Sequence, residues 1–185
     1  MTRRMPMLVT MLCGLGLACA APSTTESRAA SSTAAVQEFY DGLAGQWTGS
    51  YSLWLHAGSE AQVSETIAKG RSAPGAADAW LDYSWSWKGA QQAGTFFLRG
   101  SGMGTTSSWT DSWHMADEPM ECESELLDDG RRLVLLGSYP VGPGQPDWGW
   151  RTEFTLVGPD ELLMEAYNIS PDGHEELAVR AEWNR

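Results

Sequence analysis

Apolar and polar side chains alternate along most of this chain, and this period of two constrains the fold more than any other feature. The clearest case lies within residues 80–88, where Leu81, Tyr83, Trp85 and Trp87 are separated by Asp and Ser residues. A helix would instead group residues that are three or four positions apart. The alternation predicts a β-strand with one buried face and one solvated face.

Other segments repeat the pattern. Apolar residues lie two apart, with polar residues between them, at residues 47–55, 120–126, 148–156 and 177–183. Short sequences that favour tight turns separate the strands: Asp-Asp-Gly at 128–130, Gly-Pro-Asp at 158–160 and Pro-Asp-Gly at 171–173. Asp and Gly tolerate the positive φ angles that hairpin turns require. The chain is therefore expected to fold as consecutive antiparallel strands.

The number of strands and their short connections indicate how the sheet is arranged. We expect nine or ten strands, with one short helix at Val36–Leu43 before the first of them. Sequential antiparallel strands with one apolar face each can pair both edges by closing into a barrel. The prediction is an all-β protein, a single antiparallel up-and-down β-barrel of about 9–10 strands over residues 38–185. A β-sandwich is the alternative.

Several short motifs resemble those of a bacterial family called domain of unknown function 1579. The Gly-x-Trp sequence at Gly45–Trp47 resembles the opening of lipocalin-like barrels, and Trp-Thr-Asp-Ser at 109–112 resembles a segment of the family. The end of the chain resembles the closing hairpin of the family. The residues that carry this likeness are Glu165, Tyr167, Pro-Asp-Gly at 171–173, Glu175, Glu182 and Arg185. The resemblance spans about residues 38–185. It implies an exported lipocalin-like (calycin) barrel and no assigned reaction.

The N-terminal residues have the features of an export signal. Arg3 and Arg4 precede an apolar run at residues 7–18, which is shorter than the roughly 20 residues that a membrane span needs. Small residues follow, so residues 1–20 are predicted to be a signal peptide. Cys19 is the candidate lipidation site, which predicts a lipoprotein of the bacterial periplasm or outer membrane. Ordinary cleavage, which would discard Cys19 and give a soluble secreted protein, is the alternative.

The segment after the signal differs in composition from the barrel. Residues 21–37 are mostly Ser, Thr and Ala, with almost no spaced apolar residues. This composition is typical of a flexible linker. We predict a tether that holds the barrel away from a membrane surface.

The balance of charges excludes some partners. The chain has 24 acidic and 12 basic residues, a formal net charge of −12. Nucleic-acid binding requires a basic surface, so no nucleic-acid partner is expected. Anionic lipids would repel such a protein, so membrane attachment is expected only through the lipid anchor. Cys122 would be the one cysteine left in the barrel, and it is predicted to be a buried, inert thiol.

Ten tryptophans are the strongest compositional feature of the chain. Aromatic side chains bury roughly 150–250 Å² each, so they either fill a core or line a cavity. We take the aromatic residues of three predicted strands, with one carboxylate among them, as candidate ligand-binding residues: Tyr83, Trp85, Trp87, Trp109, Asp111, Trp113, Trp148 and Trp150.

Asp111 is the polar member of this set. On a predicted strand at 108–115 it lies on one face with two indoles, where a charged carboxylate is costly to bury without a donor. It could orient a ligand, because binding pockets combine apolar walls with a few placed polar groups. Alternatively, it could pair with Arg99, Arg151 or a backbone N–H near the barrel mouth.

Metal and catalytic signatures do not stand out. His56, His114 and His174 lie in separate segments, and no Cys or His spacing suits zinc. The sequence contains no evident Ser-His-acid set or pair of closely spaced carboxylates. We therefore predict no metal, no cofactor and no catalytic residues.

These observations favour an exported cell-envelope barrel that binds a small hydrophobic, aromatic or sugar ligand. The alternative is a non-catalytic structural or interaction lipoprotein with a solid core. A third possibility is an isomerase or cyclase of lipocalin-like fold that acts on an apolar substrate.

Overall fold

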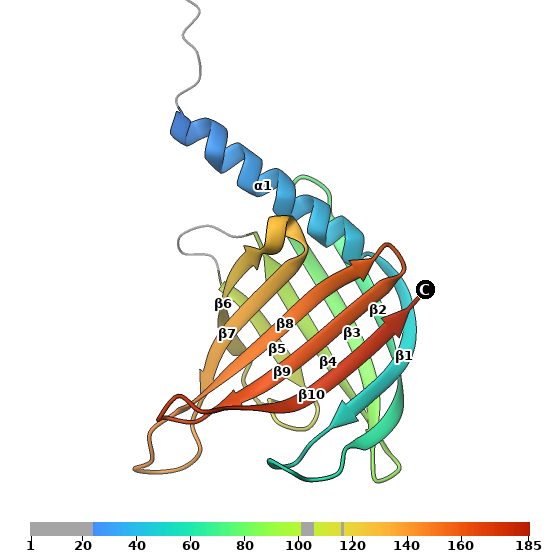
Figure 1. Ribbon diagram of the computed structural model, residues 1–185, viewed down its shortest axis with the longest axis vertical. Coiled ribbons are helices and arrows are strands. Elements are labelled where there is room, and N and C mark those ends of the chain that lie inside the picture. Colours follow the sequence, from blue (N-terminus) through green and yellow to red (C-terminus); the bar gives the residue numbers. More distant parts are fainter. Residues whose placement is uncertain (1–23, 101–105, 116) are drawn as a thin grey trace, which may run out of the picture.

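A computed structural model describes residues 24–100, 106–115 and 117–185 of the chain. Cys19 and the predicted signal peptide lie outside these residues. Within the described residues, one α-helix, α1 (Thr24–Leu43), precedes ten strands and a single 3₁₀ turn, η1 (Asp128–Gly130) (Figure 1). The strands are β1 (Gly45–Leu53), β2 (Gln62–Ala73), β3 (Asp78–Trp87), β4 (Ala90–Arg99), β5 (Thr106–Asp111), β6 (Met120–Leu127), β7 (Arg132–Tyr139), β8 (Trp148–Gly158), β9 (Glu161–Ile169) and β10 (Glu175–Asn184).

The strands form a closed antiparallel barrel in which each strand pairs with its neighbours in sequence. The ring closes between β1 and β10, where Thr48 is opposite Asn184 and Leu53 is opposite Val179. The predicted all-β, up-and-down barrel is confirmed, and the sandwich alternative is wrong. Closure removes the two sheet edges that an open sheet would expose.

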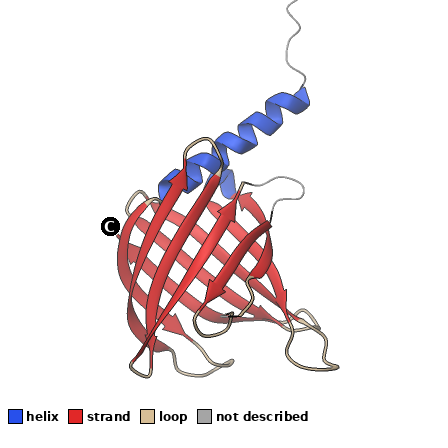
Figure 2. Ribbon diagram, turned by 180° about the vertical axis from the view of Figure 1, so that it is seen from behind, coloured by secondary structure: helices blue, strands red, loops and turns tan. Residues whose placement is uncertain are grey.

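Helix α1 covers one end of the barrel. Val36, Phe39, Tyr40 and Leu43 are each at most 1% exposed, and they recur at the spacing of one helical face. The Tyr40 hydroxyl donates a hydrogen bond to the carbonyl oxygen of Arg99 at 2.7 Å. Seen from behind, the helix crosses the barrel end and its N-terminal half projects away from the strands (Figure 2). The opposite end is formed by the β1–β2, β3–β4, β5–β6, β7–β8 and β9–β10 connections, and no helix of the described residues covers it (Figure 1). This end is called the mouth.

The helix is longer than the sequence pattern indicated. The predicted helix was Val36–Leu43 and the predicted flexible tether was residues 21–37, but the structure has helix from Thr24 onward. The segment contains no proline, and its first glycine is Gly42. Alanine, which is frequent here, has the highest helix propensity of all residues. Local propensity therefore extends a helix whose last two turns are held by packing.

The end of α1, the start of β1 and the end of β10 are tied together by two side chains. Trp47 Nε1 donates to the carbonyl oxygen of Leu43 at 2.9 Å. The Arg185 guanidinium lies 4.1 Å from the centre of the Trp47 ring system and donates to the carbonyl oxygens of Gly42 and, at 3.0 Å, Ala44. Carbonyl groups at a helix C-terminus lack intrahelical partners. Arg185 supplies these partners and fastens the helix over the barrel.

Two strands depart from strict alternation. The strand predicted at 108–115 ends at Asp111, because its carboxylate accepts hydrogen bonds from the backbone N–H groups that follow and turns the chain. In β10 the register shifts between Leu177 and Val179, which is a β-bulge. Ala178 and Val179 are both buried as a result, whereas Leu177 was expected to face the core. A bulge inserts one residue and reverses the alternation beyond it.

Cys122 lies on the inner face of β6 and is 3% exposed. Burial, together with the nearby charge of Glu121, raises the pKa of its thiol to about 12. The prediction of a buried thiol is confirmed. Among the described residues no helix combines the length and apolar character that a bilayer span requires.

Candidate functional site at the mouth of the barrel

A stack of aromatic rings fills much of the barrel interior. Six rings from five strands form the stack, and each ring is nearly parallel to the next. Their spatial order is Tyr51, Trp85, Tyr83, Phe96, Trp109 and Trp150. Neighbouring ring centroids are 5.1, 5.4, 5.5, 5.9 and 5.3 Å apart, and no interplanar angle exceeds 22°. Offset stacking at these separations is favourable beyond the area it buries. Buried aliphatic side chains such as Leu81, Leu98 and Leu133 pack with these rings in one core.

Small residues on the inner faces make room for the rings. Gly94 is opposite Tyr83 in the β3–β4 pair, and a Cβ atom at Gly94 would lie 2.6 Å from the Tyr83 ring. Within the stack, Trp109 Nε1 donates to the Tyr83 hydroxyl at 3.0 Å. Burial raises the pKa of Tyr83 well above its usual value, with smaller contributions from Tyr51 and Asp111, so its hydroxyl stays neutral.

The stack ends in a cavity of about 210 Å³ at the mouth. Its walls come from seven strands, β1 and β5 to β10, and from the connections beside them. The lining residues are Leu53, Trp54, Leu55, Trp109, Trp113, His114, Met115, Met120, Tyr139, Trp150, Asn168 and Ala178. The cavity is therefore rich in indole and thioether groups, with one imidazole and one amide among them.

Asp111 organises one wall of this cavity. Its Oδ1 accepts hydrogen bonds from the backbone N–H groups of Trp113 at 3.1 Å, Met115 at 2.9 Å and His114, and its Oδ2 lies 2.9 Å from His114 Nδ1. Burial acts to raise the pKa of Asp111. The hydrogen bonds from the His114 side chain and from the Met115 and His114 N–H groups outweigh burial and lower that pKa below 3.8. The carboxylate is thus ionised at neutral pH and holds Trp113 and His114 in place.

The opposite wall has a second fixed polar group. The Tyr139 hydroxyl donates to Asn168 Oδ1 at 2.6 Å. Tyr139 ends β7 and Asn168 lies near the end of β9, so both strands deliver these side chains to the mouth. The bond directs the amide oxygen toward the tyrosine.

The predicted candidate residues divide into three groups. Trp109, Trp113 and Trp150 line the cavity. Tyr83 and Trp85 belong to the stack and do not line the cavity, and Trp85 is 1% exposed.

The remaining candidates lie beside the cavity. Trp87 stacks on Trp113 at 5.3 Å and supports it from outside the lining. Asp111 contacts His114 from behind the cavity wall. Trp148 is the first residue of β8, lies opposite Tyr139 of β7 and does not line the cavity. The backbone N–H partner that was the alternative for Asp111 is present. Within the described residues, no hydrogen bond or ion pair joins Asp111 to Arg99 or Arg151.

Sequence reasoning missed several residues of this site. Tyr139 and Asn168 end the inner faces of β7 and β9, where alternation was visible in Leu133, Leu135 and in Leu162, Met164. Extending each alternating series to its last member would have identified both residues. Trp54 lies beyond the end of β1, and no periodicity marks it.

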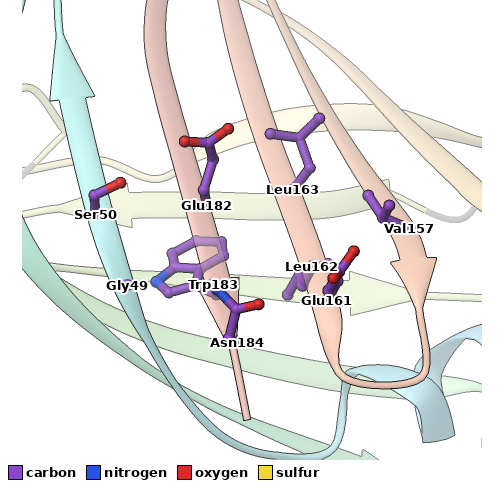
Figure 3. Close-up of a pocket in the computed structure, with 9 residues that line it drawn as sticks. All are labelled: Gly49, Ser50, Val157, Glu161, Leu162, Leu163, Glu182, Trp183 and Asn184. Carbon is purple, nitrogen blue, oxygen red and sulfur yellow. The ribbon is translucent and has the colours of Figure 1, made fainter.

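A larger groove of about 570 Å³ lies on the outer wall of the barrel (Figure 3). It crosses β1, β10, β9 and β8, and Glu161 and Glu182 place carboxylates on it. The side chains of Leu162 and Trp183 belong to the core, since each is 1% exposed. The part of the chain that the structure describes holds no cluster of three or more His, Cys, Asp or Glu residues suited to a metal. The groove is therefore a solvated depression, and the mouth cavity is the candidate site.

A protein-family model matches most of the chain. The model described as "Protein of unknown function (DUF1579)" matches residues 33–185. The chain belongs to this family. The match begins within α1 and ends at Arg185, so the DUF1579 domain comprises the packed part of the helix and the whole barrel. The resemblance noted from the motifs is confirmed.

Two further comparisons complete the account of this DUF1579 protein. No curated protein matches the chain. One similar solved structure is that of the S-type phycobiliprotein lyase CPES from Guillardia theta, with a TM-score of 0.49 and 15% sequence identity. The alignment covers 81% of this chain and 92% of the lyase chain.

Proposed function

We propose that this protein is an exported binding protein that holds a small hydrophobic or aromatic molecule in the mouth cavity. The observation that carries the proposal is the convergence of four indoles, from Trp54, Trp109, Trp113 and Trp150, on one cavity at the uncovered end. Ligand sites combine mostly apolar walls with a few oriented polar groups. His114 and Asn168 are such groups here, each held by a hydrogen bond.

The export part of the proposal rests on the sequence. The charged start, the short apolar run and the small residues around Cys19 are typical of a secretory signal. Attached through a lipid at Cys19, the protein would have its membrane anchor on the same side as α1. The mouth, at the other end of the barrel, would then face away from the membrane.

Binding can be tested with naphthalene, a compact neutral aromatic probe, by following the change in the intrinsic tryptophan fluorescence of the protein. The expected result is saturable binding that Trp113→Ala weakens by about tenfold, which corresponds to about 1.4 kcal/mol. Trp80→Ala is the matched control, because Trp80 stacks on Phe97 on the outer wall at 4.9 Å. Equal weakening by both variants would contradict a site at the mouth.

One observation favours a second function. The aromatic stack fills the barrel interior, as expected for a structural or interaction protein with a solid core. Absence of saturable binding by the neutral probe would support that alternative. Metabolic labelling with radioactive palmitate addresses the anchor separately, since label that persists in Cys19→Ala would refute lipidation at this residue.

A further inference from the structure

The two polar groups of the mouth cavity differ in what they can offer a ligand. An ionised carboxylate only accepts hydrogen bonds, so the His114 Nδ1 atom beside Asp111 Oδ2 carries a proton. In the neutral imidazole the other nitrogen, Nε2, is then an acceptor. His114 Nε2 makes no hydrogen bond within the described residues, and the side chain is 46% exposed at the cavity. With the imidazole neutral, one wall therefore presents a fixed acceptor.

The amide of Asn168 offers the complementary group. Its Oδ1 accepts from the Tyr139 hydroxyl, so its Nδ2 atom carries the two available hydrogens. Within the described chain Nδ2 has no hydrogen-bond acceptor of its own. Asn168 is half-buried and lines the same cavity as His114. The second wall therefore presents a fixed donor.

The cavity walls select for shape. Trp109 and Trp150 stack at 5.3 Å with an angle of 9° between their planes, and the Trp113 ring lies 4.3 Å from that of His114. Flat indole faces favour a flat partner. The volume of about 210 Å³ is below the roughly 300–1,000 Å³ of ordinary ligand pockets. A compact ring system suits this space, whereas a long acyl chain does not.

Charge at the mouth discriminates against anions. Asp111 is ionised and buried directly behind His114. The chain as a whole carries a formal charge of −12. A ligand that bears a carboxylate or phosphate would be repelled both on approach and in the site.

Building on the proposed binding function, we propose that the mouth cavity takes a compact, neutral nitrogen heteroaromatic ring. A ring N–H of the ligand donates to His114 Nε2, and a ring nitrogen or carbonyl of the ligand accepts from Asn168 Nδ2. The indoles of Trp109, Trp113 and Trp150 form the apolar wall around the ring. Asp111 acts as a positioning residue, since it fixes the tautomer of His114 without touching the ligand.

The test uses three probes with the same number of ring atoms but different polar groups. Benzimidazole has both an N–H donor and an acceptor nitrogen, indole has the donor only, and indene has neither. Calorimetric titration of the purified barrel at neutral pH should rank benzimidazole first and indene last. Each hydrogen bond contributes about 0.5–1.5 kcal/mol, so the expected separation of the extremes is about tenfold or more.

Two variants assign the preference to the named groups. His114→Phe and Asn168→Leu remove one polar group each and keep a similar volume. Each should reduce benzimidazole binding toward the level of indene while leaving indene binding unchanged. His174→Phe is the matched control, because His174 is exposed in the β9–β10 connection and does not line the cavity.

The outcomes distinguish a failure of the proposed binding function from a failure of the proposed ligand class. If none of the three probes binds, the proposed binding function fails, and the ligand class fails with it. If all three bind with equal affinity, the binding function stands and the ligand class is overturned. A benzimidazole preference that survives both substitutions would also overturn the assignment to His114 and Asn168.

Discussion

Replacing Asp111 by Asn removes the charge that holds the mouth loop while keeping the size of the side chain. Asn Oδ1 can still accept from the N–H groups of Trp113, His114 and Met115. Hydrogen bonds to a charged group contribute about 1.5–3 kcal/mol, against about 1 kcal/mol for neutral pairs. With the Asp111 side chain 2% exposed, we expect Asp111→Asn to lose about 2 kcal/mol of unfolding free energy at neutral pH.

The pH dependence of that loss provides the decisive measurement. The pKa of Asp111 is lower in the folded protein than the unfolded value of about 3.9. Its contribution is therefore complete above the unfolded pKa and disappears as pH falls through the folded pKa. Urea unfolding, followed by tryptophan fluorescence, should show a gap between wild type and variant at neutral pH that closes in acid.

Asp147→Asn is the matched control, because Asp147 is exposed in the β7–β8 connection. It should unfold like the wild type at both pH values. A gap for Asp111→Asn that stays constant between neutral pH and about pH 3 would refute the reasoning, since a charge-dependent contribution must be lost on protonation.

Three further predictions follow from the packing. Gly94→Ala should lower the free energy of unfolding by about 1–3 kcal/mol, because its Cβ would lie 2.6 Å from the Tyr83 ring; an unchanged melting temperature would contradict that contact. Arg185→Gln should cost about 1–3 kcal/mol in urea unfolding through lost carbonyl contacts and the 4.1 Å contact with Trp47. Cys122 should react slowly with Ellman's reagent until the protein unfolds, because burial raises its thiol pKa to about 12; rapid native reaction would show an accessible thiolate.

The barrel was predictable because alternation is a property of consecutive residues. The inward series Leu81, Tyr83, Trp85 needs only the pleat of a strand to specify which side is buried. The bulge at Ala178 was not predictable in this way, since a one-residue register shift depends on the pairing with β9. The part of α1 before Val36 has no amphipathic pattern, so an analysis of hydrophobic periodicity does not detect it. Helix propensity extends α1 through this part.

The candidate site was predicted only in part, for a related reason. Trp109, Trp113 and Trp150 were recognisable from their side-chain type, but the stack geometry comes from strands far apart in sequence. Asp111 shared a predicted face with two indoles. The structure instead shows that its carboxylate ends the strand, because local N–H groups compete with sheet pairing.

The pairing of β1 with β10 has a consequence for how the chain matures. Thr48 finds its partner, Asn184, only after every other strand has been synthesised. Until then the growing sheet has two open edges, and such edges readily recruit other chains. Pairing of the final strand with β1 is therefore the step that removes both open edges.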